Sequence, residues 1–454
     1  MILADFHLHS KYSRATSPLM DVIGLGKAAK EKGINLLGTG DFTHPMYFAE
    51  LKKNLTKFNE GIFIEEKSGT KFILTTEICL IFSKEINKVK KVRKIHLLVF
   101  AKNFEIAEQI NDWLSGVGNL KADGRPIFGM NAVDFTEKML KISGENFIVP
   151  AHLWTPWFGI LGSKSGFDSI EECFEDQSRH IHAIETGLSS DPAMNWRVSE
   201  LDKYALISNS DSHSLHNLGR ECNAFNFDEE KVNYQDIINA IKFKDKNKFL
   251  FTLEVPPEFG KYHYTGHRNC NFSCTPEESI NLHNICPVCN NPLTIGVEQR
   301  VEELADRKSG FIPKDAIPFK NIIPLWEICE KFKVKDKEKI LLGKFDNEMN
   351  VLLNAEIDEI DRIDENIANV IESLRNNKYI VKPGYDGVYG EILTEGGNKS
   401  QGCKEKDKEK DNKGKEKDNK GKEKDNKGKE KDNKGKEKEK SKGKERQKGL
   451  DEFL

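Results

Sequence analysis

The chain has 454 residues, long enough for about three domains at roughly 150 residues each, so a buried core does not need disulfide bonds. Of its 70 basic and 73 acidic residues, 49 and 58 lie in residues 1–403, which makes that part of the chain acidic. A broad electropositive surface that coats nucleic acid is therefore disfavoured, and any nucleic-acid site must be local or metal-assisted.

The cellular compartment follows from what the sequence lacks. No stretch reaches the ~20 apolar residues that a membrane helix needs, and the N-terminus shows no basic segment followed by an apolar run. We therefore expect no membrane partner and a cytoplasmic, nucleoid-associated protein. In that compartment the nine cysteines are expected to be reduced thiols or metal ligands, because the cytosol keeps thiols reduced.

Short apolar runs alternate with amphipathic stretches from residue 2 to about residue 241, a pattern typical of an α/β fold with a parallel sheet or barrel. The runs and stretches cover residues 2–6, 20–32, 36–39, 72–77, 96–100, 106–114, 147–151, 183–185 and 205–209. Strands in such folds end at the catalytic face, so the polar residues that follow each run are the first candidates for a site.

The sequence pattern changes at two further places, near residue 250 and beyond residue 403. A connector with Pro256 and Pro257 places a boundary near residue 250, and apolar residues at three-to-four spacing over residues 340–374 predict one long helix or two short ones. Beyond residue 403 a seven-residue Lys/Glu/Asp repeat has no apolar position, so we expect a disordered tether and not a coiled coil. The predicted segments are a catalytic domain (1–248), a connector with a cysteine module (249–310), a helical domain (311–395), a charged linker (396–446) and a terminal motif (447–454).

Metal-ligand side chains recur at the ends of the predicted strands. His7 and His9 lie on the same side of an extended segment, about 7 Å apart along the backbone, although a lone His-x-His pattern is weak evidence. Other imidazoles and carboxylates follow later runs at Asp41, His44, Glu77, His96, His152, Asp211 and His213. Zn²⁺, Mn²⁺ and Fe accept these ligands, and a cluster of such cations suits phosphodiester hydrolysis because it activates water and stabilises charge on phosphate oxygens.

The order His-x-His, Gly-Asp, Glu, His, His, Asp-x-His resembles the PHP (polymerase and histidinol phosphatase) metallo-phosphoesterases over roughly residues 1–245. The resemblance implies a distorted (β/α)₇ barrel with several divalent cations, Zn²⁺, Mn²⁺ or Mg²⁺. It implies one metal held by His7, His9, Glu77 and Asp211, which would be the catalytic residues, a second held by Glu77, His96 and His152, and a third held by His213 with Asp41 and His44. The sequence departs from the family where Phe42 follows Asp41 and the histidine comes only at position 44.

Four cysteines form a Cx₃C–x₁₁–CxxC set. Thiolates at this spacing meet the tetrahedral demand of structural Zn²⁺ and would hold together a module too small for a core of its own. The predicted ligands are Cys270, Cys274, Cys286 and Cys289.

The cysteine module narrows the resemblance. Together with the stretch over residues 292–307 and the Pro-Gly-Tyr-Asp-Gly-Val-Tyr-Gly segment at residues 383–390, it is similar to the endonuclease Q family of archaea and some bacteria over about residues 1–393. This resemblance implies a metal-dependent DNA repair endonuclease that acts on double- or single-stranded DNA. Such an enzyme would cut on the 5′ side of deaminated bases (uracil, hypoxanthine, xanthine) or of abasic sites.

Lesion recognition inside a duplex requires that the base is turned out of the stack, for which an apolar or aromatic wedge is suited. Trp154, Trp157 and Phe158 follow the proposed ligand His152, so we expect them at the nucleotide, with an aromatic plug packed on the barrel as the alternative. Arg14 and Arg220 are expected to neutralise phosphate charge, although a plain surface role is equally open for each.

The last eight residues regain apolar side chains after 43 residues without any. Gln447, Leu450, Phe453 and Leu454 resemble the PIP box by which repair proteins bind the sliding clamp PCNA, with Leu454 in place of the second aromatic residue. Clamp binding would raise the local concentration of the enzyme at DNA.

Two other functions fit parts of the sequence. A PHP-type phosphomonoesterase acting on a small phosphorylated metabolite needs the same metal ligands, but it leaves the cysteine module and the tail unexplained. A nonenzymatic DNA or clamp adaptor with a degenerate barrel is disfavoured by the nearly full ligand set.

Overall fold

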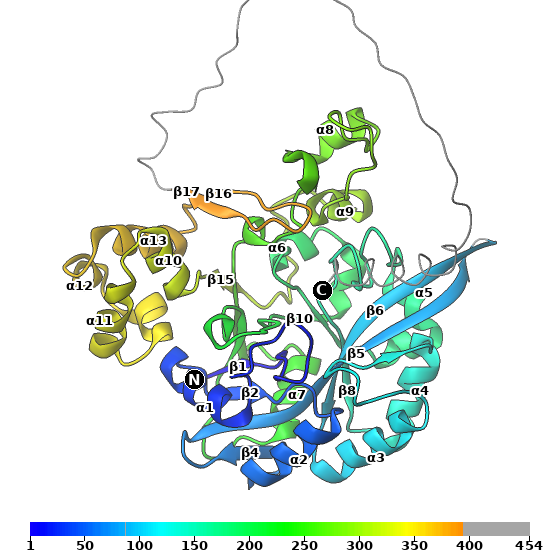
Figure 1. Ribbon diagram of the computed structural model, residues 1–454, viewed down its shortest axis with the longest axis horizontal. Coiled ribbons are helices and arrows are strands. Elements are labelled where there is room, and N and C mark those ends of the chain that lie inside the picture. The colour runs from blue at the N-terminus through cyan, green and yellow to red at the C-terminus, as the bar shows by residue number, and fades with distance from the viewer. Residues whose placement is uncertain (87, 394–454) are drawn as a thin grey trace, which may run out of the picture. The chain divides into compact units, whose positions relative to one another are not determined.

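The structure of the protein is a computed structural model, described here for residues 1–86 and 88–393. The described residues belong to one compact unit of mixed α/β structure, which confirms the predicted α/β class (Figure 1). The predicted linker (396–446) and terminal motif (447–454) lie outside the described residues. No helix in the described segments is both long and apolar enough to serve as a membrane span.

Seventeen strands are present in the described residues. They are β1 (Ile2–Asp5), β2 (Leu36–Gly38), β3 (Thr56–Asn59), β4 (Ile62–Glu65), β5 (Thr70–Ile86), β6 (Val89–Ala101), β7 (Ile127–Phe128), β8 (Phe147–Pro150), β9 (Ala183–Glu185), β10 (Ala205–Ile207), β11 (Cys222–Phe225), β12 (Phe249–Glu254), β13 (Thr265–His267), β14 (Phe272–Cys274), β15 (Phe319–Asn321), β16 (Ile380–Lys382) and β17 (Glu391–Leu393). Most are short, and only β5 and β6 exceed ten residues.

The α-helices in the described residues surround the strands and form a separate group near the C-terminal end of the unit. They are α1 (Val22–Lys32), α2 (Pro45–Asn54), α3 (Phe104–Ser115), α4 (Ala132–Ile142), α5 (Ile170–Phe174), α6 (Pro192–Asn195), α7 (Tyr234–Lys242), α8 (Pro276–Asn281), α9 (Val297–Leu304), α10 (Leu325–Lys331), α11 (Lys335–Phe345), α12 (Ile357–Asp361) and α13 (Glu365–Arg375).

One mixed sheet organises the unit. Its main path runs β15-β12-β11-β1-β2-β5-β4-β3, with β6 and β7 paired to β5, and β8 paired to β6. The β1–β2 and β2–β5 pairs are parallel, whereas β1–β11 and β5–β6 are antiparallel. Strands β9 and β10 form a separate parallel pair, so closure into a seven-stranded barrel stays a prediction. The predicted boundary at residue 248 falls just before β12, which belongs to the same sheet.

Local sequence signals explain where helices begin and end. The Asp21 side chain accepts the Gly24 N–H at the start of α1, and Gly33 ends this helix with φ +83°, a conformation that side chains with a Cβ rarely adopt. A capping box between Asn233 and Asp236 starts α7. The buried faces of α1–α4 pack with one side of the strands, and those of α7 with the other (Figure 1).

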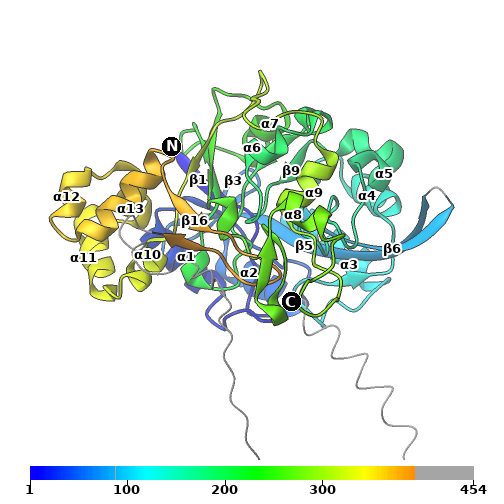
Figure 2. The ribbon, with the colours of Figure 1, turned by 90° about the horizontal axis from the view of Figure 1, so that it is seen from above.

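The β5–β6 hairpin is the least expected element. Sequence runs predicted separate short strands at residues 72–77 and 96–100, but the two strands pair without interruption from Leu74–Ala101 to Ile86–Val89. β5 is buried through Leu80 and becomes partly or fully exposed from Ile81 onward. Both ribbon views show its end projecting from the body (Figures 1 and 2).

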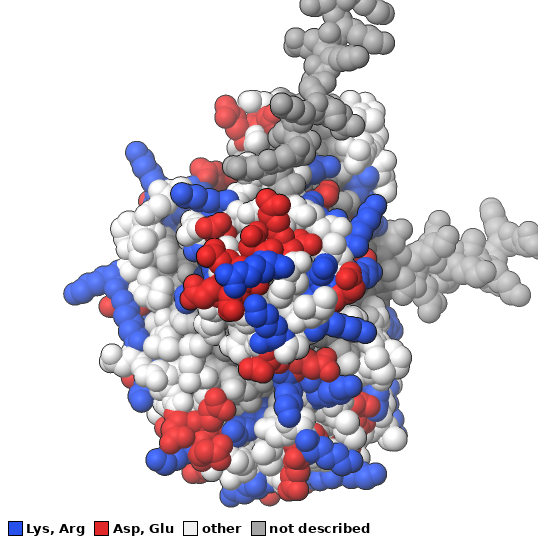
Figure 3. Space-filling view, turned by 90° about the vertical axis from the view of Figure 1, so that its left-hand side faces the viewer, with Lys and Arg blue, Asp and Glu red and all other residues white. Residues whose placement is uncertain are grey.

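The C-terminal helical segment is more divided than predicted. In place of one long helix or two short ones, the chain forms α11, a π-helical turn at Asn350–Asn354, α12 and α13. Helix α11 ends at Asp346, which has φ +70° and so cannot continue the helix. Asp364 caps the start of α13, because its side chain accepts hydrogen bonds from two backbone N–H groups. On the side of the unit that this segment covers, acidic and basic side chains are interspersed, so that face is not a broad basic surface (Figure 3).

Candidate functional site

The predicted ligands converge from separate strands. His7 and His9 follow β1, Glu77 and His96 lie on the paired strands β5 and β6, His152 follows β8, and Asp211 follows β10. Two groups of ligand atoms result, each within 4.8 Å: His7, His9 and Asp211, and Glu77, His96 and His152.

Glu77 joins the two groups. Its Oε1 lies 2.7 Å from His96 Nδ1, 3.1 Å from His152 Nε2 and 3.6 Å from His7 Nε2. Its Oε2 lies 3.2 Å from His9 Nε2. One carboxylate therefore faces both groups, which is the arrangement that a bridging ligand requires.

The first group leaves polar atoms without hydrogen bonds. His7 Nε2, His9 Nε2 and Asp211 Oδ1 are buried and have no hydrogen-bond partner within the described residues. His9 Nε2 lies 3.2 Å from Asp211 Oδ1, but this contact lacks hydrogen-bond geometry. Buried polar atoms are rarely left unpaired, and two imidazole nitrogens with a carboxylate oxygen are a donor set that divalent cations accept. The residues therefore fit a metal.

The electrostatics of the site favour positive charge at its centre. Burial opposes ionisation of Glu77 and Asp211, but the neighbouring histidines, and Arg125 at Glu77, outweigh it and hold both pKa values well below the usual range. Burial also opposes protonation of His7, yet Glu185 and Glu77 raise its pKa well above the usual value. The carboxylates thus require a compensating cation, whether protons on imidazole or metal ions.

Two buried groups that the sequence did not single out support the ligands. Both oxygens of Glu185 lie 3.0 Å from His7 Nδ1, and this carboxylate also accepts the His152 backbone N–H and the Asn209 amide. Arg125 Nη1 lies 3.1 Å from Glu77 Oε2. Glu185 is the last residue of the apolar run 183–185, and this position was the one sequence signal that could have identified it. No predicted strand precedes Arg125, so no such signal marks that position.

The structure does not gather the residues of the expected third group. Asp41 accepts hydrogen bonds from the Ser10 backbone and hydroxyl and from the Ser13 hydroxyl, and it lies 3.2 Å from His9 Nδ1. Asp41 therefore orients the His9 ring from its Nδ1 side, opposite the Nε2 atom that faces Glu77 and Asp211. His44 stacks on Tyr12, with ring centroids 4.3 Å apart, so Asp41, His44 and His213 form no common group within the described residues.

His213 borders the first group. Its ring lies 4.3 Å from the His9 ring, and its Nδ1 donates to the Asp211 carbonyl oxygen at 3.0 Å. Burial and the charge on His9 lower the pKa of His213 to about 4, so the ring is neutral and its Nε2 keeps a free lone pair. The side chains of His213 and Asp211 are 30% and 31% exposed, so this edge of the site faces solvent.

Several site residues adopt a backbone conformation that is costly for side chains with a Cβ. Asp41, His152 and Asp211 have φ values of +41°, +29° and +47°. Gly187 makes room beside His152, because a Cβ at this glycine would lie 2.8 Å from the His152 Cα. The fold holds these strand ends in a strained geometry that directs the side chains inward.

The aromatic residues predicted at DNA divide into two kinds. Trp154 is 1% exposed and donates its indole N–H to Asn195 at 2.8 Å, so it is a core residue and not an accessible wedge. Phe158 stacks on His96 with ring centroids 4.3 Å apart, and Trp157 packs edge-to-face with Tyr262. Both of these side chains are half-buried.

The two predicted phosphate-binding arginines also differ. Arg14 is 51% exposed and pairs with Asp123 at 3.3 Å. Arg220 is buried and donates through Nε to the Ser210 carbonyl oxygen at 2.9 Å, one residue before Asp211. Arg220 therefore holds the backbone beside a ligand, a role that its sequence position did not indicate.

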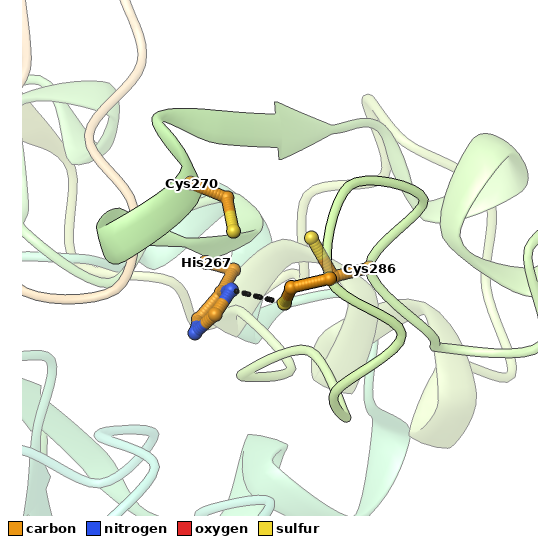
Figure 4. A group of neighbouring side chains, drawn as sticks. His267, Cys270 and Cys286 are labelled. Carbon is orange, nitrogen blue, oxygen red and sulfur yellow. Dashed lines mark hydrogen bonds between the residues drawn. The ribbon is translucent and has the colours of Figure 1, made fainter. Parts of the chain in front are cut away.

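The cysteine module gathers three of the four predicted zinc ligands together with a histidine. His267, Cys270, Cys286 and Cys289 bring their ligand atoms within 4.8 Å, and Figure 4 shows His267, Cys270 and Cys286 pointing toward one another. Cys274 lies outside this group: it pairs with Thr265 at the other end of the β13–β14 ladder, where its thiol contacts the Thr265 carbonyl oxygen. His267 pairs with Phe272 at the near end and takes the fourth place.

The thiol chemistry of this group suits a cation. Burial opposes ionisation of Cys286, but the backbone N–H groups of Val288 and Cys289 outweigh it and lower the pKa of Cys286 to about 6. A thiolate is therefore present at neutral pH, and thiolate is the form of cysteine that binds zinc.

Comparisons with known proteins find relatives that match most of the chain. The family model of the MJ0043 C-terminal domain matches residues 332–378. The uncharacterised protein YqxK of Bacillus subtilis is 30% identical over 405 residues, which cover 86% of this chain and 99% of YqxK. The uncharacterised protein MJ0043 of Methanocaldococcus jannaschii is 34% identical over 252 residues, which cover 53% of this chain and 31% of that protein.

Two solved structures match most of the chain. The crystal structure of the lesion-specific endonuclease PfuEndoQ from Pyrococcus furiosus has a TM-score of 0.75 at 31% identity, and the match covers 86% of this chain and 94% of PfuEndoQ. A crystal structure of endonuclease Q in complex with a 27-mer duplex substrate, with an abasic lesion at the active site, has a TM-score of 0.76 at 32% identity, over 86% of this chain and 96% of that one. Sequence and structure agree over nearly the whole length of these proteins, and the chain belongs to the endonuclease Q family.

Proposed function

We propose that this protein is a metal-dependent DNA repair endonuclease that hydrolyses the phosphodiester bond on the 5′ side of deaminated bases and abasic sites. The observation that carries the proposal is the pair of donor groups joined by Glu77, in which His7, His9 and Asp211 present unpaired atoms. Membership of the endonuclease Q family, and the abasic-lesion duplex bound by one relative, support DNA as the substrate.

The ligands divide between two positions. His7, His9 and Asp211 would hold one divalent cation and His96 with His152 a second, with Glu77 shared. Cations at these positions supply Lewis acidity, which activates water for attack on phosphorus and stabilises negative charge on the phosphate oxygens.

The protein side chains set the geometry of the reaction. Glu185 and Asp41 fix the rings of His7 and His9 through their Nδ1 atoms, so both Nε2 atoms face Glu77 and Asp211. His7, His9 and Glu77 are fully buried and exclude water, whereas Asp211 and His213 border solvent. The phosphate is therefore expected to enter beside Asp211 and His213, where His213 Nε2 is available to accept a proton or a hydrogen bond.

The proposal is tested by mapping products. Labelled duplexes that carry uracil, hypoxanthine, xanthine or an abasic site are incubated with the purified protein, and the position of the nick is read against a sequence ladder. We expect a nick on the 5′ side of each lesion and none in the undamaged duplex. Release of phosphate from small phosphomonoesters without any nick would favour the phosphomonoesterase alternative, and binding without any hydrolysis would favour the adaptor.

Trp157 and Phe158 are proposed to contact the displaced nucleotide, with Arg14 on a neighbouring phosphate. The half-buried Phe158 ring stacks on His96 at the proposed metal site, and the half-buried Trp157 follows one residue earlier in the chain, which supports this role. Trp154 is not part of the proposal, because it is buried.

A structural zinc ion in the cysteine module is proposed on the ligand set His267, Cys270, Cys286 and Cys289. The module has a small core of its own, formed by Cys274, Cys286 and Leu293. A closed tetrahedral site would therefore supply most of its folding energy.

The C-terminal residues Gln447, Leu450, Phe453 and Leu454 are proposed to bind the sliding clamp PCNA. The PIP-box spacing supports this partner. Deletion of residues 447–454 should abolish binding to purified clamp in a surface plasmon resonance assay, whereas undiminished binding would end the proposal.

A further inference from the structure

The two strands that carry Glu77 and His96 continue well beyond the proposed metal site. Cys79 pairs with His96, and the strands remain paired for seven more residues to Ile86 and Val89. We call residues 81–86 and 88–94 the ribbon. It projects from the body in both views (Figures 1 and 2). At about 3.4 Å per residue, its tip lies about 24 Å along the strands from the Cys79–His96 pair.

The ribbon has a charge opposite to that of the rest of the folded part. Residues 82–94 contain six Lys or Arg and one Asp or Glu, although residues 1–403 as a whole are acidic. Lys84 and Arg93 anchor the ribbon, Lys84 through Glu175 and Arg93 through the Gly166 carbonyl oxygen. Lys88, Lys90 and Lys91 are exposed and form no ion pair within the described residues.

The strand alternation directs part of this charge along the face that bears the site. Lys94 and Lys90 lie two and six residues from His96 on β6, so all three side chains share a face with Glu77 of β5. Lys94 Nζ lies 5.7 Å from the centre of the Phe158 ring, which itself stacks on His96. Two lysines, Lys94 and Lys90, therefore extend outward from the proposed metal site on this face, with Glu85 opposite Lys90.

A cleft at the base of the ribbon adds two cations, Lys164 and Arg300, to those of the ribbon. It has a volume of about 450 Å³, and Lys91, Arg93, Lys164 and Arg300 line it together with a single acid, Asp168. Arg300 pairs with Asp168, whereas Lys164 donates to the Leu293 carbonyl oxygen at 3.3 Å. The cleft thus joins the ribbon to α9 and to the cysteine module.

We propose that the ribbon and this cleft hold backbone phosphates of the duplex that flanks the cleavage site. The inference rests on the proposed function, which gives DNA as the substrate. It adds to that function the protein surface that binds the duplex on either side of the lesion. A two-stranded ribbon fits the major groove, and its exposed lysines can pair with phosphates on either side. With ~3.4 Å per base pair, the ribbon would reach about seven base pairs from the site.

The first test removes the charge at the tip. Full-length protein with Lys88→Ala, Lys90→Ala and Lys91→Ala is compared with wild type for binding to an abasic duplex, by fluorescence anisotropy over a series of salt concentrations. Each phosphate contact contributes about 0.9 to the slope of log Kd against log salt, so the slope should fall by about 2 to 3 and Kd should rise about tenfold or more. Lys27→Ala, Lys53→Ala and Lys231→Ala, three exposed lysines outside the ribbon, form the matched control and should change neither value.

The second test measures reach. Duplexes are shortened on one side of the lesion or on the other, from about twelve to about four base pairs, which is less than the estimated span of the ribbon. Relative to the longest duplex, wild type should bind one of the two shortened duplexes more weakly, the one that lacks base pairs on the side of the ribbon. The variant with Lys88→Ala, Lys90→Ala and Lys91→Ala, here called the tip variant, should bind all of these duplexes with equal affinity. Lys164→Gln should likewise weaken binding, because it removes a cation from the cleft.

The outcomes separate this inference from the proposed function. A wild-type salt slope equal to that of the tip variant, or equal affinity for all duplex lengths, would overturn the inference even if the protein nicks DNA. A protein that binds duplexes through the ribbon but makes no nick would support the inference and overturn the proposed function.

Discussion

Glu185 contacts the Nδ1 side of His7 with both carboxylate oxygens, at 3.0 Å each, while the Nε2 side of the same ring faces Glu77 and Asp211. The proton of His7 is thereby directed to Nδ1, and Nε2 is left to bind a cation. The same carboxylate accepts the His152 N–H, so one buried acid orients residues of both donor groups.

Replacement of this acid tests its role as a positioning residue. Glu185→Gln should lower the affinity of the proposed metal site for divalent cations by about 10- to 100-fold, because ligand orientation is lost while all ligands remain. Isothermal titration with Mn²⁺ measures the affinity. Glu137→Gln, an exposed change on α4, is the control. An unchanged affinity in Glu185→Gln would contradict the role.

The cysteine module allows a paired comparison. His267→Ala should lower the zinc content of the purified protein and its thermal stability, whereas Cys274→Ser should leave the zinc content at one ion per chain, because Cys274 lies outside the ligand group. The metal content, measured by mass spectrometry, distinguishes the ligand set that includes His267 from the set of four cysteines. Loss of zinc in Cys274→Ser with retention in His267→Ala would restore the four-cysteine set.

Two neighbouring tryptophans should respond differently. Trp154→Ala empties a buried position and breaks the hydrogen bond to Asn195, so the free energy of unfolding should fall by about 3–5 kcal/mol. Trp157→Ala should destabilise the protein less and should weaken binding to lesion DNA. Chemical denaturation and anisotropy titrations measure the two effects, and equal DNA affinity of Trp157→Ala and wild type would remove Trp157 from the DNA contact.

Glu254 makes stability depend on pH. Burial raises its pKa from 4.5 to about 8, and Thr252, Ser208 and Thr186 surround its carboxyl. Between these two pKa values the unfolded chain ionises while the folded protein keeps the proton, so stability is full below about pH 4.5 and falls as pH rises toward 8.

Glu254→Gln isolates this contribution. The variant should lose less stability than wild type between pH 5 and pH 8, by up to about 1.4 kcal/mol per pH unit for one proton. Urea denaturation at several pH values provides the measurement. Parallel stability curves for the two proteins would show that Glu254 is ionised in the folded state.

The sequence predicted the donors that follow apolar runs, because the strands end at a common face: His7, His9 and Asp211 lie in one group, and His152 lies in the second group, which Glu77 joins to the first. The sequence pattern does not show in which direction a side chain points after its strand, and this direction decides whether the residue is a ligand. Asp41 also follows a strand, but its carboxylate points at Ser10 and His9 instead of a shared cation site.

Other features left little trace in the sequence. His267 lies outside the cysteine spacing and joins Cys270, Cys286 and Cys289 only through the β13–β14 ladder. The ribbon lacks a buried face, so its strands do not show the apolar alternation by which half-buried strands are recognised. Arg125 reaches Glu77 from a loop, and no periodic pattern marks such a position.

The central claim, that His7, His9, Glu77 and Asp211 hold cations that cut DNA beside a lesion, is tested most directly with one abasic duplex. Nicking is measured for protein stripped with chelator, for the same protein after Mn²⁺ is restored, and for Asp211→Asn with Mn²⁺. We predict a nick on the 5′ side of the lesion only in the restored wild type, with the Asp211→Asn rate lower by a factor of about 100 or more. A nick of equal rate in the stripped protein or in Asp211→Asn would contradict the account.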